Sequence, residues 1–176
     1  AEVTDVSTAV YEEADAIMLS GETATGKYPA RCVETLDRIA KRTELDGAIG
    51  NGERAVLTTD KQKVILAATK LADSLPNAEL VVFTKRGRMA VQAALLRPGA
   101  CIHAFAPNAE TCRKLSLARG IEPNVLEFRD EPLETINLAV DYLKENNLVK
   151  EGTPLVVLSD TLRQSNPVDS ILVIYA

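Results

Sequence analysis

Hydrophobic residues follow two different spacings along the chain. In some stretches they recur every three or four positions, as on one face of a helix, and in others they form short apolar runs typical of buried strands. After residue 57 these spacings predict helices at about 60–74, 87–96, 109–119 and 133–145, and strands at 80–83, 101–105, 125–128, 155–158 and 171–175.

This alternation of helices and strands predicts an α/β fold. A sheet built from successive strand–helix units is mostly parallel and is covered on both faces by helices, which gives a three-layer αβα domain. The segment before the strand at 171–175 is too short for a crossover helix, so that strand is expected to be antiparallel. The prediction is a five-stranded, mostly parallel sheet whose last strand is antiparallel.

The first 45 residues form a separate pattern of helix, strand and helix, at 1–13, 16–19 and 29–44. One strand cannot form a sheet by itself, so it either joins the later sheet or belongs to a larger β/α domain. Three glycines between residues 47 and 52 mark a boundary, which favours the second alternative. We therefore predict a remnant of another domain at 1–45, a linker at 46–57 and a complete domain at 58–176.

Composition narrows the classes of partner. The 176 residues carry a net charge of −5, which argues against nucleic acid or an anionic membrane as the main partner. No apolar run approaches the roughly 18 residues of a membrane span, and the first residues do not follow the pattern of a signal peptide. The three cysteines have no paired spacing, which favours reduced thiols and a cytoplasmic location.

The cysteines and the single histidine are expected to be structural. Cys32 and Cys112 lie on apolar helix faces, Cys101 opens a strand, and His103 lies inside that strand. Packing is the usual role of such cysteines, and no Cys/His spacing of a metal site is present. The sequence therefore predicts no metal site.

A polar cluster follows the apolar run that ends at Leu19. Ser20 and Glu22 would lie at the carboxyl end of the predicted strand, where ligands gather in parallel α/β folds. The plain alternative is a polar turn after a buried strand. Without a nearby histidine the two residues make no triad, and Glu22 remains open as an acid, a base or a structural anchor.

A second polar segment, Thr84 to Arg88, lies between a predicted strand and a predicted helix. The glycine at 87 permits a tight turn, the start of the helix favours an anion, and Lys85, Arg86 and Arg88 carry charges suited to phosphate. A phosphate or sugar-phosphate site and a solvated basic loop remain equally open. No Walker motif or full dinucleotide fingerprint is present.

Arg163 lies in the polar segment 159–167, which follows the strand at 155–158. This segment also leaves the carboxyl end of a strand, so Arg163 is a candidate second phosphate ligand. The alternative is a surface hairpin loop.

Several segments closely resemble the pyruvate kinase family. Those similar to the end of its catalytic barrel are 1–6, 14–24 and 26–29, and those similar to its C-terminal domain are 82–88, 96–98 and 117–121. The resemblance implies phosphoryl transfer from phosphoenolpyruvate to ADP, with Mg²⁺ and K⁺ bound by residues upstream of this chain. It implies that Ser20 borders the active site, that Glu22 positions neighbouring groups, and that the chain alone is inactive.

The resemblance also implies an effector-binding loop. Thr84 and Gly87 match the family pattern, whereas Arg86 and Met89 stand where small hydroxyl residues are usual. The implied phosphate-binding residues are Thr84, Lys85, Arg86, Gly87, Arg88, Met89 and Arg163. The implied partners are a phosphorylated sugar or nucleotide effector and further copies of the chain, because the family forms tetramers.

Three functions remain to be compared. The chain is the regulatory C-terminal part of a pyruvate kinase, a stand-alone module that binds sugar phosphates, or a structural domain that holds subunits together.

Overall fold

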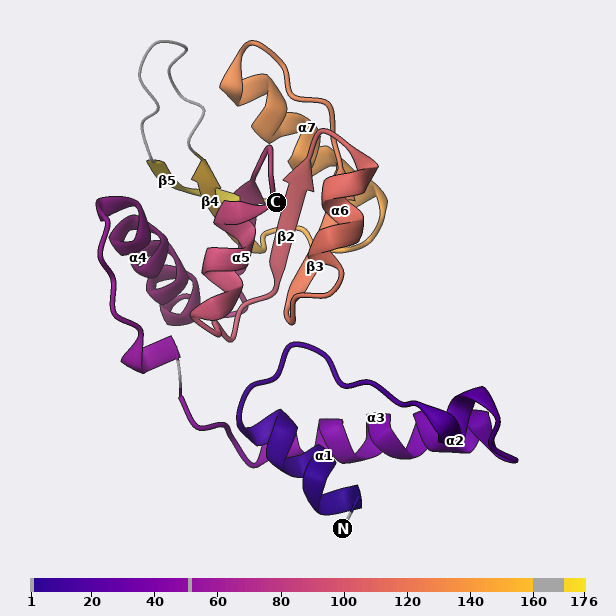
Figure 1. Cartoon of the computed structure of the whole chain (residues 1–176). Coiled ribbons are helices and arrows are strands. Elements are labelled where there is room, and N and C mark those ends of the chain that lie inside the picture. The colour runs from indigo at the N-terminus through magenta and orange to yellow at the C-terminus, as the bar shows by residue number, and fades with distance from the viewer. Residues whose placement is uncertain (1, 51, 160–169) are drawn as a thin grey trace. The chain divides into compact units, whose positions relative to one another are not determined.

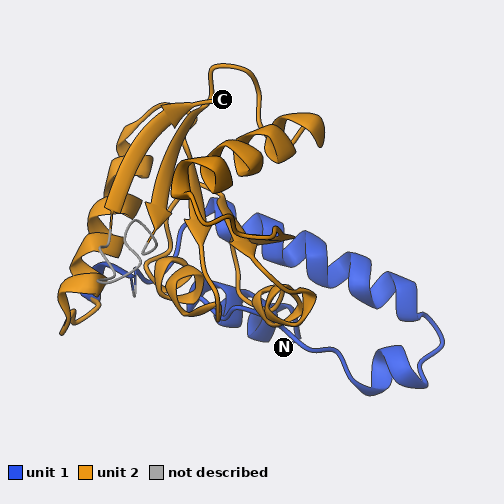
Figure 2. Cartoon of the chain, turned by 90° about the horizontal axis from the view of Figure 1, so that it is seen from above, with its two compact units in different colours: residues 1–54 blue, residues 55–176 orange. Residues whose placement is uncertain are grey.

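The computed structural model describes residues 2–50, 52–159 and 170–176 and divides the chain into two compact units, residues 1–54 and 55–176 (Figures 1 and 2). The first unit contains α1 (Glu2–Tyr11), α2 (Gly21–Ala24), α3 (Pro29–Leu45) and a short 3₁₀ turn at Gly52–Arg54. The second contains α4 (Asp60–Ser74), β1 (Glu79–Phe83), α5 (Arg88–Leu95), β2 (Ile102–Ala106), α6 (Ala109–Leu115), β3 (Ile121–Val125), α7 (Pro132–Glu145), β4 (Pro154–Ser159) and β5 (Ser170–Tyr175).

The five strands form one sheet in the order β3-β2-β1-β4-β5. All neighbouring pairs are parallel except β4 and β5, which run antiparallel. The structure thus confirms the predicted α/β class, the number of strands and the direction of the last strand.

Two hydrophobic cores lie on opposite faces of this sheet because successive side chains of a strand point to opposite sides. On one face, Leu80 and Val82 of β1 pack with residues of α4 and α5 such as Ile65 and Ala93. On the other, Val81 and Phe83 pack with residues that include Leu143 of α7. The sheet is therefore covered by helices on both faces, as the three-layer prediction requires.

Local signals in the sequence account for the helix starts. The Thr59 side chain accepts a hydrogen bond from the backbone of Gln62, whose side chain accepts one from the backbone of Thr59, which completes a capping box for α4. The Asn108 side chain caps α6 by accepting from the Thr111 amide at 2.9 Å. Pro29 occupies the first turn of α3, where its missing amide hydrogen costs nothing.

The predicted strand at 16–19 is wrong. Residues 16–20 have no regular secondary structure, and the Met18 side chain is 85% exposed. Strands need hydrogen-bonded neighbours, and the described residues of the first unit contain no other strand with which this run could pair. The polar cluster that was expected to end a strand instead begins α2 at Gly21.

The third strand of the sheet lies at Ile121–Val125 and not at 125–128 as predicted. It is an edge strand, so Pro123, which has no amide hydrogen, is tolerated within it. The apolar residues beyond it still reach the core, because the Phe128 ring packs edge-on against Phe83 with the ring centroids 5.8 Å apart. The apolar residues at 125–128 thus predicted contact with the core correctly, but not which residues form the strand's hydrogen bonds.

Two predicted helical features also differ. The helix expected at 109–119 ends at Leu115, and Leu117 is 70% exposed. In α7 the predicted inward residue Leu133 is largely exposed, whereas Thr135 is buried and its hydroxyl oxygen accepts a hydrogen bond from the Arg129 backbone amide at 2.9 Å. None of the helices formed by the described residues has both the length and the apolar character needed to cross a bilayer.

Candidate functional site

Strands are added to the sheet on both sides of β1, so the order of addition changes side there. The chain moves from β1 to β2 and β3 on one side, and then returns to add β4 on the other side of β1. In open α/β sheets, ligands bind outside the carboxyl ends of the strands at such a switch point. The segment that leaves β1 at this place is the basic turn, defined here as residues 84–88.

Thr84 and Gly87 set the geometry of the basic turn. Thr84 is buried, and its amide donates to the Phe105 carbonyl at 2.9 Å, which continues the sheet by one hydrogen bond. Gly87 has φ of +82°, and a Cβ there would lie 3.2 Å from Cδ2 of Leu115. A side chain at this position would be both strained and crowded, so glycine lets the turn pass close to α6.

The first turn of α5 follows Gly87 directly. The structure shows no side-chain cap at this helix start. The first amides of a helix have no intrahelical acceptor, and the helix dipole adds partial positive charge at the same place. These amides therefore offer donors to an anion.

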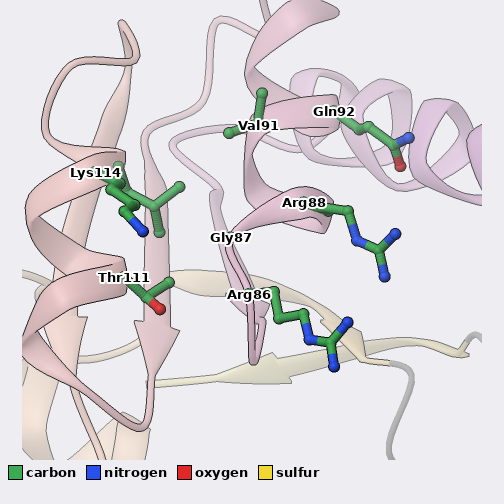
Figure 3. A pocket seen from close by; sticks show the side chains of 8 residues that line it. Arg86, Gly87, Arg88, Val91, Gln92, Thr111 and Lys114 are labelled. Atoms are coloured by element: carbon green, nitrogen blue, oxygen red, sulfur yellow. The ribbon is translucent and has the colours of Figure 1, made fainter.

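Three cationic side chains surround this helix start. Lys85, Arg86 and Arg88 are exposed, and in the part of the chain that the structure describes no acidic group forms an ion pair with them. Figure 3 shows that the side chains of Arg86 and Arg88 extend to the same side of the turn. Two guanidinium groups on the same side of a turn suit the oxygens of a phosphate group.

A pocket of about 260 Å³ adjoins the basic turn. Its lining residues are Arg86, Gly87, Arg88, Val91, Gln92, Thr111, Lys114 and Leu115 (Figure 3). Lys114 is already paired with Glu110 at 2.7 Å, so the two arginines carry the uncompensated charge of the lining. The volume lies just below the range of about 300–1,000 Å³ for sites of drug-sized ligands, so it suits a small phosphorylated group.

The predicted effector residues differ in whether their side chains line the pocket. The Met89 side chain is buried in the core, so only its backbone amide faces the helix start. Lys85 is exposed but does not line the pocket, and Arg163 lies outside the described residues. Sequence reasoning missed Gln92 and Thr111, because they come from positions outside the turn and carry no motif of their own.

Ser20 and Glu22 lie together at the start of α2. Both are exposed, and the Ser20 amide donates to a carboxylate oxygen of Glu22 at 3.1 Å. Glu22 also lines a pocket of about 570 Å³ within the first unit, whose walls include Val6, Leu36 and Ile39. The Glu22 carboxylate thus accepts a hydrogen bond from the residue that precedes α2, and the chain's single histidine lies in the other unit.

A further group of side chains meets at the opposite, amino-terminal end of the sheet. Glu79, Cys101 and His103 lie close together there, although sequence spacing predicted no metal site. Burial raises the pKa of the Cys101 thiol to about 11, and the negative charges of Glu79 and Glu122 add to the effect. The approach of these residues depends on strand register, which spacing along the chain does not show.

Comparisons with known proteins agree on one family. The family model for the pyruvate kinase alpha/beta domain matches residues 62–174, and that for the pyruvate kinase barrel domain matches residues 1–33.

Curated relatives carry the same name. Plastidial pyruvate kinase 3 of Arabidopsis thaliana is 37% identical over 86% of this chain and 27% of its own length. Pyruvate kinase isozyme G of Ricinus communis is also 37% identical, over 86% of this chain and 37% of its own length. A pyruvate kinase of Methylorubrum extorquens is 37% identical over 90% of this chain and 34% of its own length. The chain therefore spans about a quarter to just over a third of the relatives it matches, and it belongs to the pyruvate kinase family.

Proposed function

We propose that the chain is the C-terminal part of a pyruvate kinase, which transfers a phosphoryl group from phosphoenolpyruvate to ADP and yields pyruvate and ATP in glycolysis. The family matches across both units support this proposal. In it, residues 1–45 are the end of the catalytic barrel, 46–57 are the linker, and 58–176 are the regulatory and oligomer-forming domain. Ser20 and Glu22 then lie at the rim of an active site formed mainly by upstream residues.

The metal ions of the family do not fit the described residues. Mg²⁺ and K⁺ prefer oxygen ligands, whereas the one metal-ligand cluster among the described residues offers a thiol and an imidazole beside a carboxylate. The Mg²⁺ and K⁺ of the whole enzyme are therefore assigned to residues outside this chain.

It follows that the 176-residue chain alone has no kinase activity. Phosphoryl transfer depends on positioning and charge neutralisation by groups that this proposal assigns to the missing part of the barrel. An assay that couples pyruvate formation to lactate dehydrogenase should show no turnover above the blank with the purified chain. Measurable turnover that scales with the chain's concentration would contradict the proposal.

The role proposed for the second unit is to bind a phosphorylated sugar or nucleotide at the basic turn. One observation carries it: an uncapped helix start, two guanidinium groups that pair with no acidic group among the described residues, and a pocket coincide at the turn that leaves β1. Fructose bisphosphate, ribose phosphate and AMP are the candidate effectors. The whole enzyme is proposed to be a homo-oligomer.

Isothermal titration calorimetry with these three compounds tests the effector site. The chain should release or absorb heat with at least one of them. Arg88→Ala should weaken that binding by about 10–100-fold, because a hydrogen bond to a charged group contributes about 1.5–3 kcal/mol. Arg113→Ala removes an exposed arginine of α6 that does not line the pocket, and it should leave the affinity unchanged.

The outcomes of this titration distinguish the functions. Absence of heat with every compound would contradict an effector site in this chain and would favour the structural domain. Heat that Arg88→Ala leaves unchanged would place binding elsewhere.

A stand-alone sugar-phosphate module remains the alternative, since the second unit has its own core and a pocket. If the gene encodes barrel residues upstream of this chain, the chain is part of a pyruvate kinase and not a stand-alone module.

The proposed location is the cytoplasm. All three cysteines are free, which fits a reducing compartment. Several relatives are named chloroplastic and others are bacterial, so the plastid stroma is the other compartment that localisation of the tagged protein should test.

A further inference from the structure

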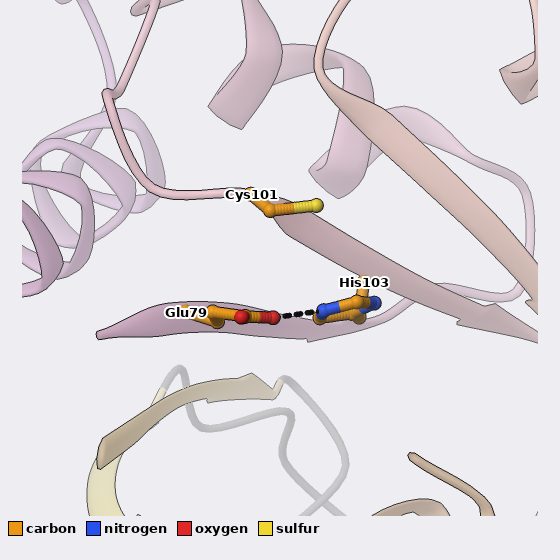
Figure 4. Close-up of side chains that lie close together, drawn as sticks. All are labelled: Glu79, Cys101 and His103. Carbon is orange, nitrogen blue, oxygen red and sulfur yellow. Dashed lines mark hydrogen bonds and ion pairs between the residues drawn. The ribbon is translucent and has the colours of Figure 1, made fainter. Parts of the chain in front are cut away.

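Three side chains that commonly bind metals meet at the amino-terminal ends of β1 and β2. Glu79 is the first residue of β1, Cys101 directly precedes β2, and His103 is the second residue of β2. A carboxylate oxygen, the sulfur and a ring nitrogen of these residues all lie within 4.8 Å of one another (Figure 4). Figure 4 shows Cys101 at the start of the strand that carries His103, with Glu79 of the neighbouring strand in contact with the imidazole.

The register of the sheet brings these groups together. Leu80 lies opposite Ile102, so the preceding residues Glu79 and Cys101 are also neighbours, and the Leu80 amide donates to the Cys101 carbonyl at 2.8 Å. His103 follows Cys101 by two positions, so both side chains point to the same face of the sheet. The cluster is therefore held by paired strands and not by a flexible loop.

His103 is the most buried member of the cluster, with 1% of its side chain exposed. Its Nε2 contacts the Glu79 carboxylate, and its Nδ1 lies 3.4 Å from Oε2 of Glu122 on β3 without forming a hydrogen bond. Metal-binding histidines usually direct their second ring nitrogen at a carboxylate or carbonyl, which fixes the tautomer and orients the ring. Glu122 stands where such a group is needed.

We propose that Glu79, Cys101 and His103 bind one Zn²⁺ ion per chain and that Glu122 orients the imidazole. Mixed sulfur, nitrogen and oxygen ligands suit Zn²⁺ better than Mg²⁺ or Ca²⁺, which prefer oxygen alone. Three protein ligands leave the fourth tetrahedral position to water. This inference is independent of the proposed kinase and effector functions, because the cluster lies at the other end of the strands from the basic turn.

Only a small adjustment is needed to bind the ion. Ligand bonds of about 2.0–2.3 Å in a tetrahedron place the donor atoms roughly 3.3–3.8 Å apart, so the most distant pair must approach by about 1 Å. His103 is fixed by burial, whereas Cys101 is only partly buried and the Glu79 side chain is 24% exposed. Rotation of these two side chains is the movement that the proposal requires.

Titration of the full 176-residue chain with Zn²⁺ and Co²⁺, after removal of metal with EDTA, tests the proposal. Competition with a chromophoric chelator should show one Zn²⁺ per chain. Co²⁺ should produce a thiolate-to-metal charge-transfer band. Cys101→Ser should abolish this band and weaken Zn²⁺ binding at least 100-fold, whereas Cys32→Ser should change neither. No stoichiometric binding, or a band that survives Cys101→Ser, would overturn the proposal.

Glu122→Gln tests the orienting role separately. Loss of an outer carboxylate typically costs 10–100-fold in metal affinity, and the variant should fall in this range with its circular dichroism unchanged. Glu127→Gln is the matched control, because this exposed carboxylate pairs with Arg129 and not with the histidine. An affinity equal to wild type in Glu122→Gln would contradict the assigned role of Glu122.

Discussion

At the scale of single residues, Gly87 determines both the backbone conformation of the basic turn and the shape of the pocket beside it. Its φ of +82° lies in the left-handed region, and its missing Cβ lets the turn approach Leu115 of α6. The same close approach places Thr111 and Lys114 in the lining of the pocket. A side chain at position 87 should therefore affect stability and the pocket together.

Gly87→Ala should lower the free energy of unfolding by about 1–3 kcal/mol, because the left-handed backbone costs an alanine about 1–2 kcal/mol and the contact with Leu115 adds to this. Urea unfolding with an unchanged slope measures the loss. Gly152→Ala is the matched control, since Gly152 has φ of +80° but no atom within 4 Å of a Cβ. Equal losses in the two variants would show that the Leu115 contact contributes nothing.

At the scale of elements, α4 shows how a local signal starts a helix that then forms part of the core. Thr59 and Gln62 exchange two hydrogen bonds between side chain and backbone at its first turn. The helix that follows places Ile65, Ala68 and Ala72 against the sheet. Loss of the cap should therefore weaken a helix on which the core depends.

Thr59→Ala should lower the free energy of unfolding by about 0.5–2 kcal/mol, because the Gln62 amide loses its acceptor. Thr59→Ser keeps a hydroxyl oxygen at the same position and should remain close to wild type. Urea unfolding followed by circular dichroism compares the three proteins. A serine variant as unstable as the alanine variant would rule out the capping hydrogen bond as the cause.

Most elements could be predicted from sequence because their signals are local, as at the capped start of α4. The strand at 16–19 was mispredicted because a strand also needs a partner, and the described part of the first unit has none. The third strand was displaced because apolar spacing reports burial, whereas pairing with β2 decides which residues are strand.

The candidate sites divide in the same way. The basic turn could be predicted because its residues are consecutive, so a single loop carries the glycine and the charges. Thr111 joins the pocket only through the packing of α6 on the turn. The cluster around His103 draws on three strands, and its members meet only once the register of the sheet is known.

At the scale of the whole molecule, the two units differ in how much they bury. The second unit contains two hydrophobic cores, and side chains such as Leu80 and Phe105 are fully buried within them. No residue of α1 or α3 is buried, although these helices pack against each other. Backbone hydrogen bonds that are not covered by buried apolar side chains break at a low cost in free energy. The first unit should therefore be locally less stable than the second.

Hydrogen exchange of the whole chain should reveal this difference. Amides of α1 and α3 should exchange at least about 100-fold faster than those of β1, β2 and β4, because opening the sheet requires unfolding of the cores. Mass spectrometry of peptic fragments measures both groups in one experiment. A chain of residues 55–176 should retain the slow exchange of its central strands, since the contacts that cover them lie within that unit. Equal protection of α3 and β1 in the full chain, or loss of protection in the shorter one, would show that the cores of the second unit do not determine local stability.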